Sequence, residues 1–165
     1  MSRVEIIYVE YPDGSIPVYD LLKDIGIKAK RDPLFAELSK HVWDGFDTLE
    51  LKGIPDWKAD FSYDWMIESE QGWTVRVDPL VKRLNHAYPL FEMRVNEWRE
   101  IGARKRMGYG FRVLFFTYNQ DGTQYIFLVN GMVKQERSPA QFEKLIAEAL
   151  HIYNQFLEDR EAFLE

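Results

Sequence analysis

Four charged residues in the second half of the chain could together act on a phosphodiester. Glu92 and Arg94 stand two positions apart, so on a β-strand their side chains leave the same face. Arg112 stands at the head of the next predicted strand, and Lys134 follows the strand after that. If these strands are neighbours, one carboxylate and three cations converge on one side of a sheet. A carboxylate can serve as a general base, and a guanidinium can hold two phosphate oxygens.

RNA cleavage is a reaction that such a group could carry out without a protein nucleophile. The ribose 2′-hydroxyl attacks the adjacent phosphate, so the protein supplies a base, cations for the phosphorane and an acid for the leaving oxygen. A structural interpretation competes with this one, because a glutamate and an arginine of neighbouring strands could form a surface salt bridge worth about 0–1 kcal/mol. Spacing alone favours the structural interpretation.

Several other catalytic classes lack their residues. The chain has no cysteine, which excludes disulfides, cysteine-ligated zinc, iron–sulfur clusters and thiol catalysis. It has no glycine-rich phosphate loop, no H-E-x-x-H and no G-x-S-x-G motif. The three histidines, His41, His86 and His151, fall on three separate predicted elements. We therefore expect neither a metal site nor a cofactor.

The first 45 residues predict a strand and two helices. Residues 4–11 are rich in β-branched and aromatic types, which is typical of a strand. Ser15 is a predicted cap of a short helix that ends near Gly26. Asp32, followed by proline, opens a second predicted helix that ends near Gly45.

Residues 90–157 predict three strands and a helix. The segments 111–118 and 125–130 are apolar on both faces, so we expect a hairpin of central strands. In the segment 90–95, alternation sends three apolar side chains to the face opposite Glu92 and Arg94. Ser138 begins a capping box that opens the last helix.

The stretch between these parts, about residues 46–89, predicts an insertion. Segments 61–67 and 73–77 suggest a second hairpin, and residues 78–84 suggest a short helix. The stretch holds three of the five tryptophans, Trp57, Trp65 and Trp73. These rings could stack on single-stranded nucleic acid, but we favour an extra layer of core.

Charge is distributed unevenly. The chain carries a net charge of -6, yet residues 76–112 hold nine Lys or Arg and four Asp or Glu, so the stretch carries +5. Part of it, residues 96–110, is a predicted basic loop. A basic segment can contact RNA phosphates, although a solvated loop explains the same composition. The candidate RNA contacts are Arg99, Arg104, Lys105 and Arg106.

The order of these motifs resembles that of the RelE/HigB toxin superfamily, in particular its phage-derived HigB-like branch. The matching segments are DGSIPVYDLL (13–22), LFEMR (90–94), FRVLFF (111–116) and IFLVNGMVKQ (126–135), followed by Ser138 and Pro139. The resemblance covers roughly residues 4–45 and 88–157. It implies an α/β fold with a small antiparallel sheet, cleavage of mRNA, usually on the ribosome, and neutralisation by a cognate antitoxin protein.

Carried over residue by residue, the resemblance assigns roles to the charged group. Glu92 becomes the candidate base, and Arg94, Arg112 and Lys134 become the contacts to the phosphate and the transition state. Tyr109 and His86 are the candidates for the general acid.

We therefore expect a single α/β (α+β) domain over residues 1–165, in which a small antiparallel sheet packs with an N-terminal helix pair and a C-terminal helix, plus an inserted hairpin. Neither a signal-peptide core nor 18 consecutive apolar residues occurs, so we expect a cytoplasmic protein without a membrane partner. The expected function is a toxin-like, metal-independent endoribonuclease. Two alternatives remain: a non-catalytic protein-binding module, and single-stranded nucleic-acid binding without cleavage.

Overall fold

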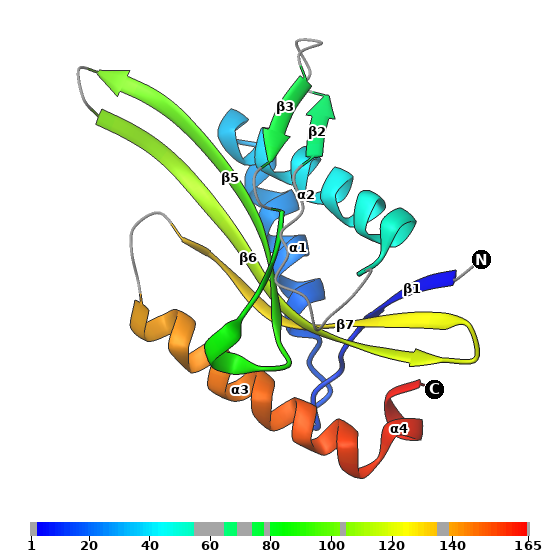
Figure 1. Cartoon of the computed structure of the whole chain (residues 1–165). Helices are drawn as coiled ribbons and strands as arrows, with labels where there is room; N and C mark the ends of the chain where they lie inside the picture. The colour runs from blue at the N-terminus through cyan, green and yellow to red at the C-terminus, as the bar shows by residue number, and fades with distance from the viewer. Residues whose placement is uncertain are drawn as a thin grey trace.

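A computed structural model of the chain describes residues 3–54, 65–68, 74–77, 80–102, 105–134 and 139–164. Its centre is a five-stranded sheet in the order β1-β7-β6-β5-β4 (Figure 1). The strands are β1 (Arg3–Tyr8), β4 (Val81–Arg83), β5 (Phe91–Gly102), β6 (Lys105–Gln120) and β7 (Thr123–Lys134). Strand β1 pairs parallel with β7 and the other pairs are antiparallel, so the sheet is mixed.

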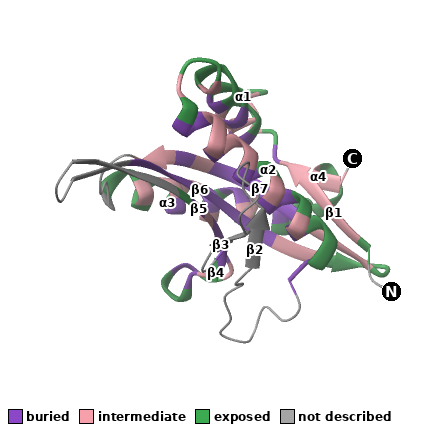
Figure 2. Cartoon of the chain, turned by 90° about the horizontal axis from the view of Figure 1, so that it is seen from above, coloured by how far each residue is buried: buried purple, intermediate pink, exposed green. Residues whose placement is uncertain are grey.

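Helices cover both faces of this sheet. Helices α1 (Pro17–Ala29) and α2 (Pro33–Lys52) pack on one face, and α3 (Pro139–Glu158) with the short α4 (Arg160–Leu164) packs on the other. Each face has its own hydrophobic cluster, so β6 and β7 are buried along most of their length (Figure 2). Burial on both faces explains why these strands are apolar at successive positions.

The predicted α+β class, the N-terminal helix pair and the C-terminal helix are confirmed. The inserted hairpin is confirmed as well, because β2 (Trp65–Glu68) pairs antiparallel with β3 (Thr74–Val77). Trp57 and Trp73 lie outside the described residues. The predicted helix over residues 78–84 is wrong: strand β4 and a 3₁₀ turn, η1 (Asn85–Ala87), follow there instead.

Three predicted helix boundaries are also wrong. Ser15 does not cap α1, since its amide and hydroxyl donate to Asp13 Oδ1 at 2.9 and 2.6 Å. Gly26 and Gly45 lie inside helices. A Cβ on Gly45 would lie 2.7 Å from Met93 Cε, so this glycine lets α2 approach the sheet closely. The predicted start of α2 is confirmed, because the Asp32 carboxylate accepts from the amide of Leu34 at 2.9 Å.

Residues 96–102 and 105–110 form strands where the sequence predicted a loop. Strands β5 and β6 stay paired as far as Gly102 and Lys105, and Figure 1 shows this ribbon projecting beyond the other strands. The basic residues and the glycines of this stretch suggested a loop.

The β6–β7 hairpin contains two features that place side chains. Its turn has positive φ at Asp121 (53°) and Gly122 (80°), as a tight Asp-Gly turn requires. Farther along, Leu114 pairs with Asn130 but Phe115 pairs with Leu128, so Val129 is an extra residue in β7. This bulge changes which face the rest of β7 presents.

Candidate functional site

Alternation along β5 divides its side chains as the sequence predicted. Phe91, Met93 and Val95 enter the hydrophobic cluster beneath α1 and α2. Glu92 and Arg94 therefore lie on the face that α3 covers in part.

Strand β6 places Arg112 beside this pair. Arg94 and Arg112 are cross-strand partners. Arg112 Nε lies 3.0 Å from Glu92 Oε1, and Arg94 Nε lies 3.6 Å from the same oxygen. Arg112 Nη1 donates to Asn96 Oδ1 at 2.9 Å and to the carbonyl of Phe111 at 2.8 Å. One carboxylate and two guanidinium groups thus meet on one face.

Glu92 and Arg112 form a buried ion pair. Their residues are 8% and 5% exposed, whereas the side chain of Arg94 is 29% exposed. The interpretation as a surface salt bridge is therefore wrong for this pair. Burial, and next the charge of Arg94, lower the pKa of Arg112 to about 10, while Glu92 acts in the opposite direction. Because this pKa is far above 7, Arg112 is cationic at neutral pH.

Lys134, the last residue of β7, reaches the same group because of the bulge. If side chains alternated strictly through Val129, with no bulge, Lys134 would face the other side of the sheet, toward α1. Lys134 pairs with Gly110, where an added Cβ would lie 3.3 Å from Lys134 Cγ and 3.3 Å from Arg112 Nη1. The lysine stem and the guanidinium thus converge on the space that glycine leaves open.

Sequence analysis missed three residues of this face. Asn96 accepts the hydrogen bond from Arg112. It stands two residues beyond Arg94, so alternation along the strand would have placed it on the same face. Gly110 resembled a loop glycine. Lys82, exposed on β4, is the cross-strand partner of Glu92, but the prediction of a helix there hid it.

The structure does not bring either candidate acid to Glu92. Tyr109 lies on the opposite face, where its ring packs 3.9 Å from that of Phe35 and its hydroxyl donates to Asp32 Oδ2 at 2.9 Å. His86 is exposed in η1, and its Nε2 lies 3.8 Å from Glu143 Oε1 of α3. Alternation counted back from Phe111 would have placed Tyr109 correctly.

Three of the four predicted RNA contacts lie in the projecting ribbon. Arg99 belongs to β5, while Lys105 and Arg106 belong to β6, with Arg106 paired to Glu100. Arg104 lies outside the described residues. The backbone thus places three basic positions on the same two strands that carry Glu92, Arg94 and Arg112.

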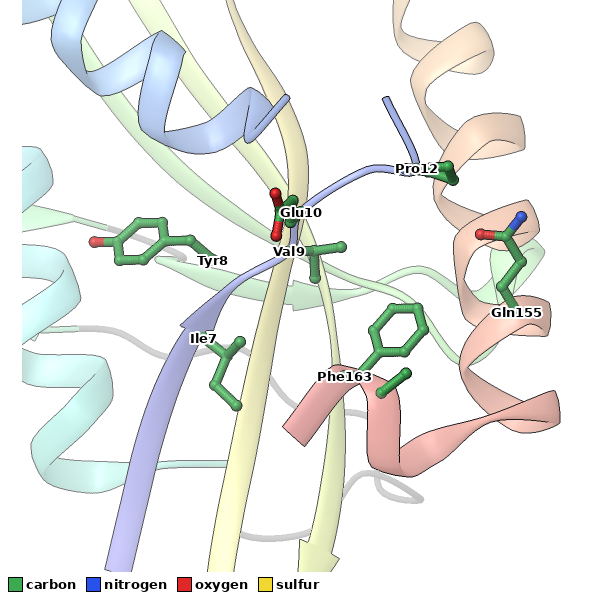
Figure 3. Close-up of a pocket in the computed structure, with 8 residues that line it drawn as sticks. Ile7, Tyr8, Val9, Glu10, Pro12, Gln155 and Phe163 are labelled. Atoms are coloured by element: carbon green, nitrogen blue, oxygen red, sulfur yellow. The ribbon is translucent and has the colours of Figure 1, made fainter. Parts of the chain in front are cut away.

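The charged group can hold an anion beside a carboxylate. The exposed Lys82 and the half-buried Arg94 and Lys134 lie around the Glu92–Arg112 pair. A separate hollow of about 270 Å³, between the end of β1 and α4, has a different character (Figure 3). Among the described residues that line this hollow, Glu10 is the one that is charged, so the hollow does not suit a phosphate.

Among the described residues, no group of three or more His, Asp or Glu side chains is placed to hold a metal ion. No helix within the described ranges is long and apolar enough to cross a membrane. Comparison of the chain with protein-family models, curated proteins and solved structures finds no match. The expected single domain and cytoplasmic location stay predictions.

Proposed function

We propose that this protein is an endoribonuclease of the RelE/HigB toxin type, which cleaves mRNA through attack of a ribose 2′-hydroxyl. The observation that carries this proposal is the meeting of Glu92, Arg94 and Arg112, with Lys134 alongside, on one face of the sheet. The strand, helix pair, three strands and final helix on which the family resemblance rests occur in the same order in the fold.

The reaction needs no group beyond the RNA and these side chains. Glu92 accepts the proton of the 2′-hydroxyl as the bond between O2′ and phosphorus forms. Arg94 and Lys134 contact the phosphate oxygens, where negative charge accumulates. The bond from phosphorus to O5′ then breaks, and the Lys134 ammonium donates a proton to the leaving oxygen. The products are a 2′,3′-cyclic phosphate and a 5′-hydroxyl.

Arg112 acts as a positioning residue in this scheme. Its guanidinium is occupied by Glu92, Asn96 and the Phe111 carbonyl, and it is almost inaccessible. It holds the carboxylate at a fixed place, and its charge stays constant over the neutral pH range. Sequence reasoning assigned it a direct phosphate contact, which Arg94 and Lys134 are better exposed to make.

The partners follow from the same resemblance. We propose the ribosome as the place where mRNA is cut and a cognate antitoxin protein as the inhibitor. The exposed cations beside Glu92 suit a polyanionic substrate, because each contact to a phosphate releases counterions from the RNA.

Purified protein incubated with ribosome-bound mRNA tests the proposal. Wild-type protein should produce fragments that begin with a 5′-hydroxyl, and induced expression should arrest growth. Glu92→Gln should lower the cleavage rate by about 10²–10⁴-fold, because it removes the base but keeps the shape. Arg94→Ala should lower RNA affinity and reduce the magnitude of its salt-dependence slope by about 1.

Two controls make the result specific. Arg3→Ala removes an exposed cation at the opposite end of the sheet and should leave cleavage unchanged. An RNA with a 2′-deoxy group at the cleaved nucleotide should stay intact. Intact mRNA with wild-type protein would contradict the enzyme proposal.

A second candidate function has one observation in its favour. The Glu92 carboxylate is engaged by two arginines and little exposed, as expected for a structural ion pair. Such a face would bind an anionic or protein partner without cutting RNA. In that case, Arg94→Ala weakens binding but wild-type protein releases no fragments.

A further inference from the structure

A second cleft lies at the edge of the sheet where β5 diverges from β6. It has a volume of about 280 Å³. Its walls include four aromatic side chains and two polar residues, namely Tyr88, Phe91, Tyr118, Tyr153, Thr117 and Asn119. The proposed reaction uses none of these groups.

The aromatic walls are held in place from behind. The Tyr118 and Tyr153 rings lie 5.3 and 6.2 Å from the ring of Phe156, and Phe91 stacks on Phe115 at 5.3 Å. Tyr88 and Tyr153 line the same cleft, and burial, followed by the proximity of Tyr88, raises the pKa of Tyr153. Tyr88 itself is 57% exposed, so a planar ligand can reach its ring.

The polar rim includes main-chain groups at the end of a strand pairing. The Arg94 amide donates to the carbonyl of Leu80, the residue before β4, so Phe91 directs its main-chain groups toward β6. Because Phe115 pairs with Phe91, the main-chain amides and carbonyls of Phe115 and Thr117 point toward β5. The pairing of β5 with β6 ends at Phe91 and Phe115. Within the described chain, the Thr117 amide and carbonyl therefore face the cleft without a partner strand.

The charge around the cleft suits a ligand that carries a phosphate. No Asp or Glu is among the residues that line it. The guanidinium carbon of Arg160 lies 5.3 Å from the centre of the Tyr118 ring, which lines the cleft. Aromatic faces, free main-chain donors and acceptors and a nearby cation are the means by which proteins hold unpaired bases.

We propose that this cleft binds a nucleobase of single-stranded RNA. The ring stacks on Tyr88, its edge bonds to the Thr117 main chain and the Asn119 amide, and its phosphate faces Arg160. The inference rests on the proposed function in one respect: the base belongs to the RNA that Glu92 cleaves. Thr117 stands five residues from Arg112 along β6, about 17 Å at the rise of a strand, so one RNA segment can span both places.

Chemical-shift changes in ¹⁵N-labelled protein test the proposal. The probes are adenosine 5′-monophosphate and a single-stranded RNA of about ten nucleotides. Both should shift the amides of Thr117 and Asn119, and the RNA should bind more tightly and also shift Arg94. Tyr88→Ala should weaken binding about tenfold or more, whereas Tyr88→Phe should retain it. Asn119→Asp should weaken binding by adding an anion without touching the rings.

Tyr19→Ala is the matched control, because Tyr19 is 56% exposed on α1, across the sheet from the cleft. An equal effect of Tyr88→Ala and Tyr19→Ala, or no shift at Thr117 and Asn119 with either probe, would overturn the proposal. So would shifts there with an uncharged leucine-rich peptide but not with RNA, which would assign the cleft to a protein partner.

The two proposals fail separately. If Glu92→Gln abolishes cleavage while the monophosphate still shifts Thr117, both stand. If wild-type protein cleaves RNA but the shifts are absent, the base cleft is wrong and the enzyme proposal survives. If the shifts appear without cleavage by wild-type protein, the cleft stands as a base-binding site and the enzyme proposal falls.

Discussion

The face of the sheet that carries the candidate site has two halves with opposite chemistry. Beneath α3, Phe116 and Phe127 stack at 5.0 Å and pack against Phe156. Four residues back along β6, Arg112 is 5% exposed and so nearly as buried as Phe116, which is 0% exposed. Arg112, however, contacts a carboxylate. Depth of burial therefore does not separate the halves. What separates them is whether the partner side chains are apolar or charged.

The two halves also differ in what they contribute to stability. Each aromatic ring under α3 removes a large apolar area from water. A buried ion pair roughly balances its own desolvation, and a hydrophobic pair in its place is often as stable or more so. The charged half is therefore poorly explained by stability, which fits the proposal that it serves a function.

The largest effect should come from emptying the aromatic half. Phe116→Ala should lower the free energy of unfolding by about 3–5 kcal/mol, because a fully buried ring leaves a cavity. Urea denaturation measures it. Phe116→Leu is the milder control. A loss below about 1 kcal/mol for the alanine variant would show that α3 does not hold this half together.

Breaking and then replacing the ion pair sharpens the contrast. Arg112→Met alone should cost about 3–5 kcal/mol, because it leaves the Glu92 carboxylate buried without its partner. Adding Glu92→Leu should restore most of the stability while RNA cleavage stays absent. A double variant as unstable as the single one would show that the pair is kept for stability.

A smaller effect is expected where the two strands leave space for Arg112. In Gly110→Ala, the added methyl would lie 3.1 Å from Asn96 Oδ1 and 3.3 Å from Arg112 Nη1. We expect a loss of about 1–3 kcal/mol, since neighbours must shift. Gly122→Ala is not a suitable control because its φ is +80°, whereas Gly26→Ala meets nothing within 4 Å. A Gly110 variant as stable as Gly26→Ala would contradict the crowding.

The smallest effect concerns high pH, where the two halves respond in opposite directions. Burial, and next the hydrogen bond to Glu148, raise the pKa of Tyr11, which also contacts Asn130 under α3. The unfolded chain releases this proton near pH 10 and the folded chain does not, so stability falls as pH rises above 10.

Arg112 contributes to the pH dependence of stability with the reverse sign. Its pKa is lowered to about 10 in the folded protein, whereas the unfolded chain keeps the proton to higher pH. Tyr11→Phe should therefore make the alkaline loss of stability shallower, and the Arg112→Met, Glu92→Leu double variant should make it steeper. Thermal melting from pH 9 to 11 measures both. Unchanged slopes in both variants would contradict the assignment.

Most of the fold was predictable because helix and strand periods are local. The face shared by Glu92 and Arg94 followed from alternation within one strand. Lys82 was not predictable, because a strand of three residues carries too little pattern and Asp78 with Pro79 imitates a helix start. The proximity of Glu92 to Arg112 depends on register between strands, which local sequence does not encode.

Because of the extra residue at Val129, the side chains of the two halves of β7 alternate in opposite phase. Before Val129 the even-numbered side chains of the strand point toward α1 and α2, and after it they point to the opposite face. Deletion of Val129 would remove the bulge and make the strand regular, and Lys134 would keep its place opposite Gly110, at the charged group. Related chains that lack this one residue would thus keep the chemistry of the face on a straighter strand.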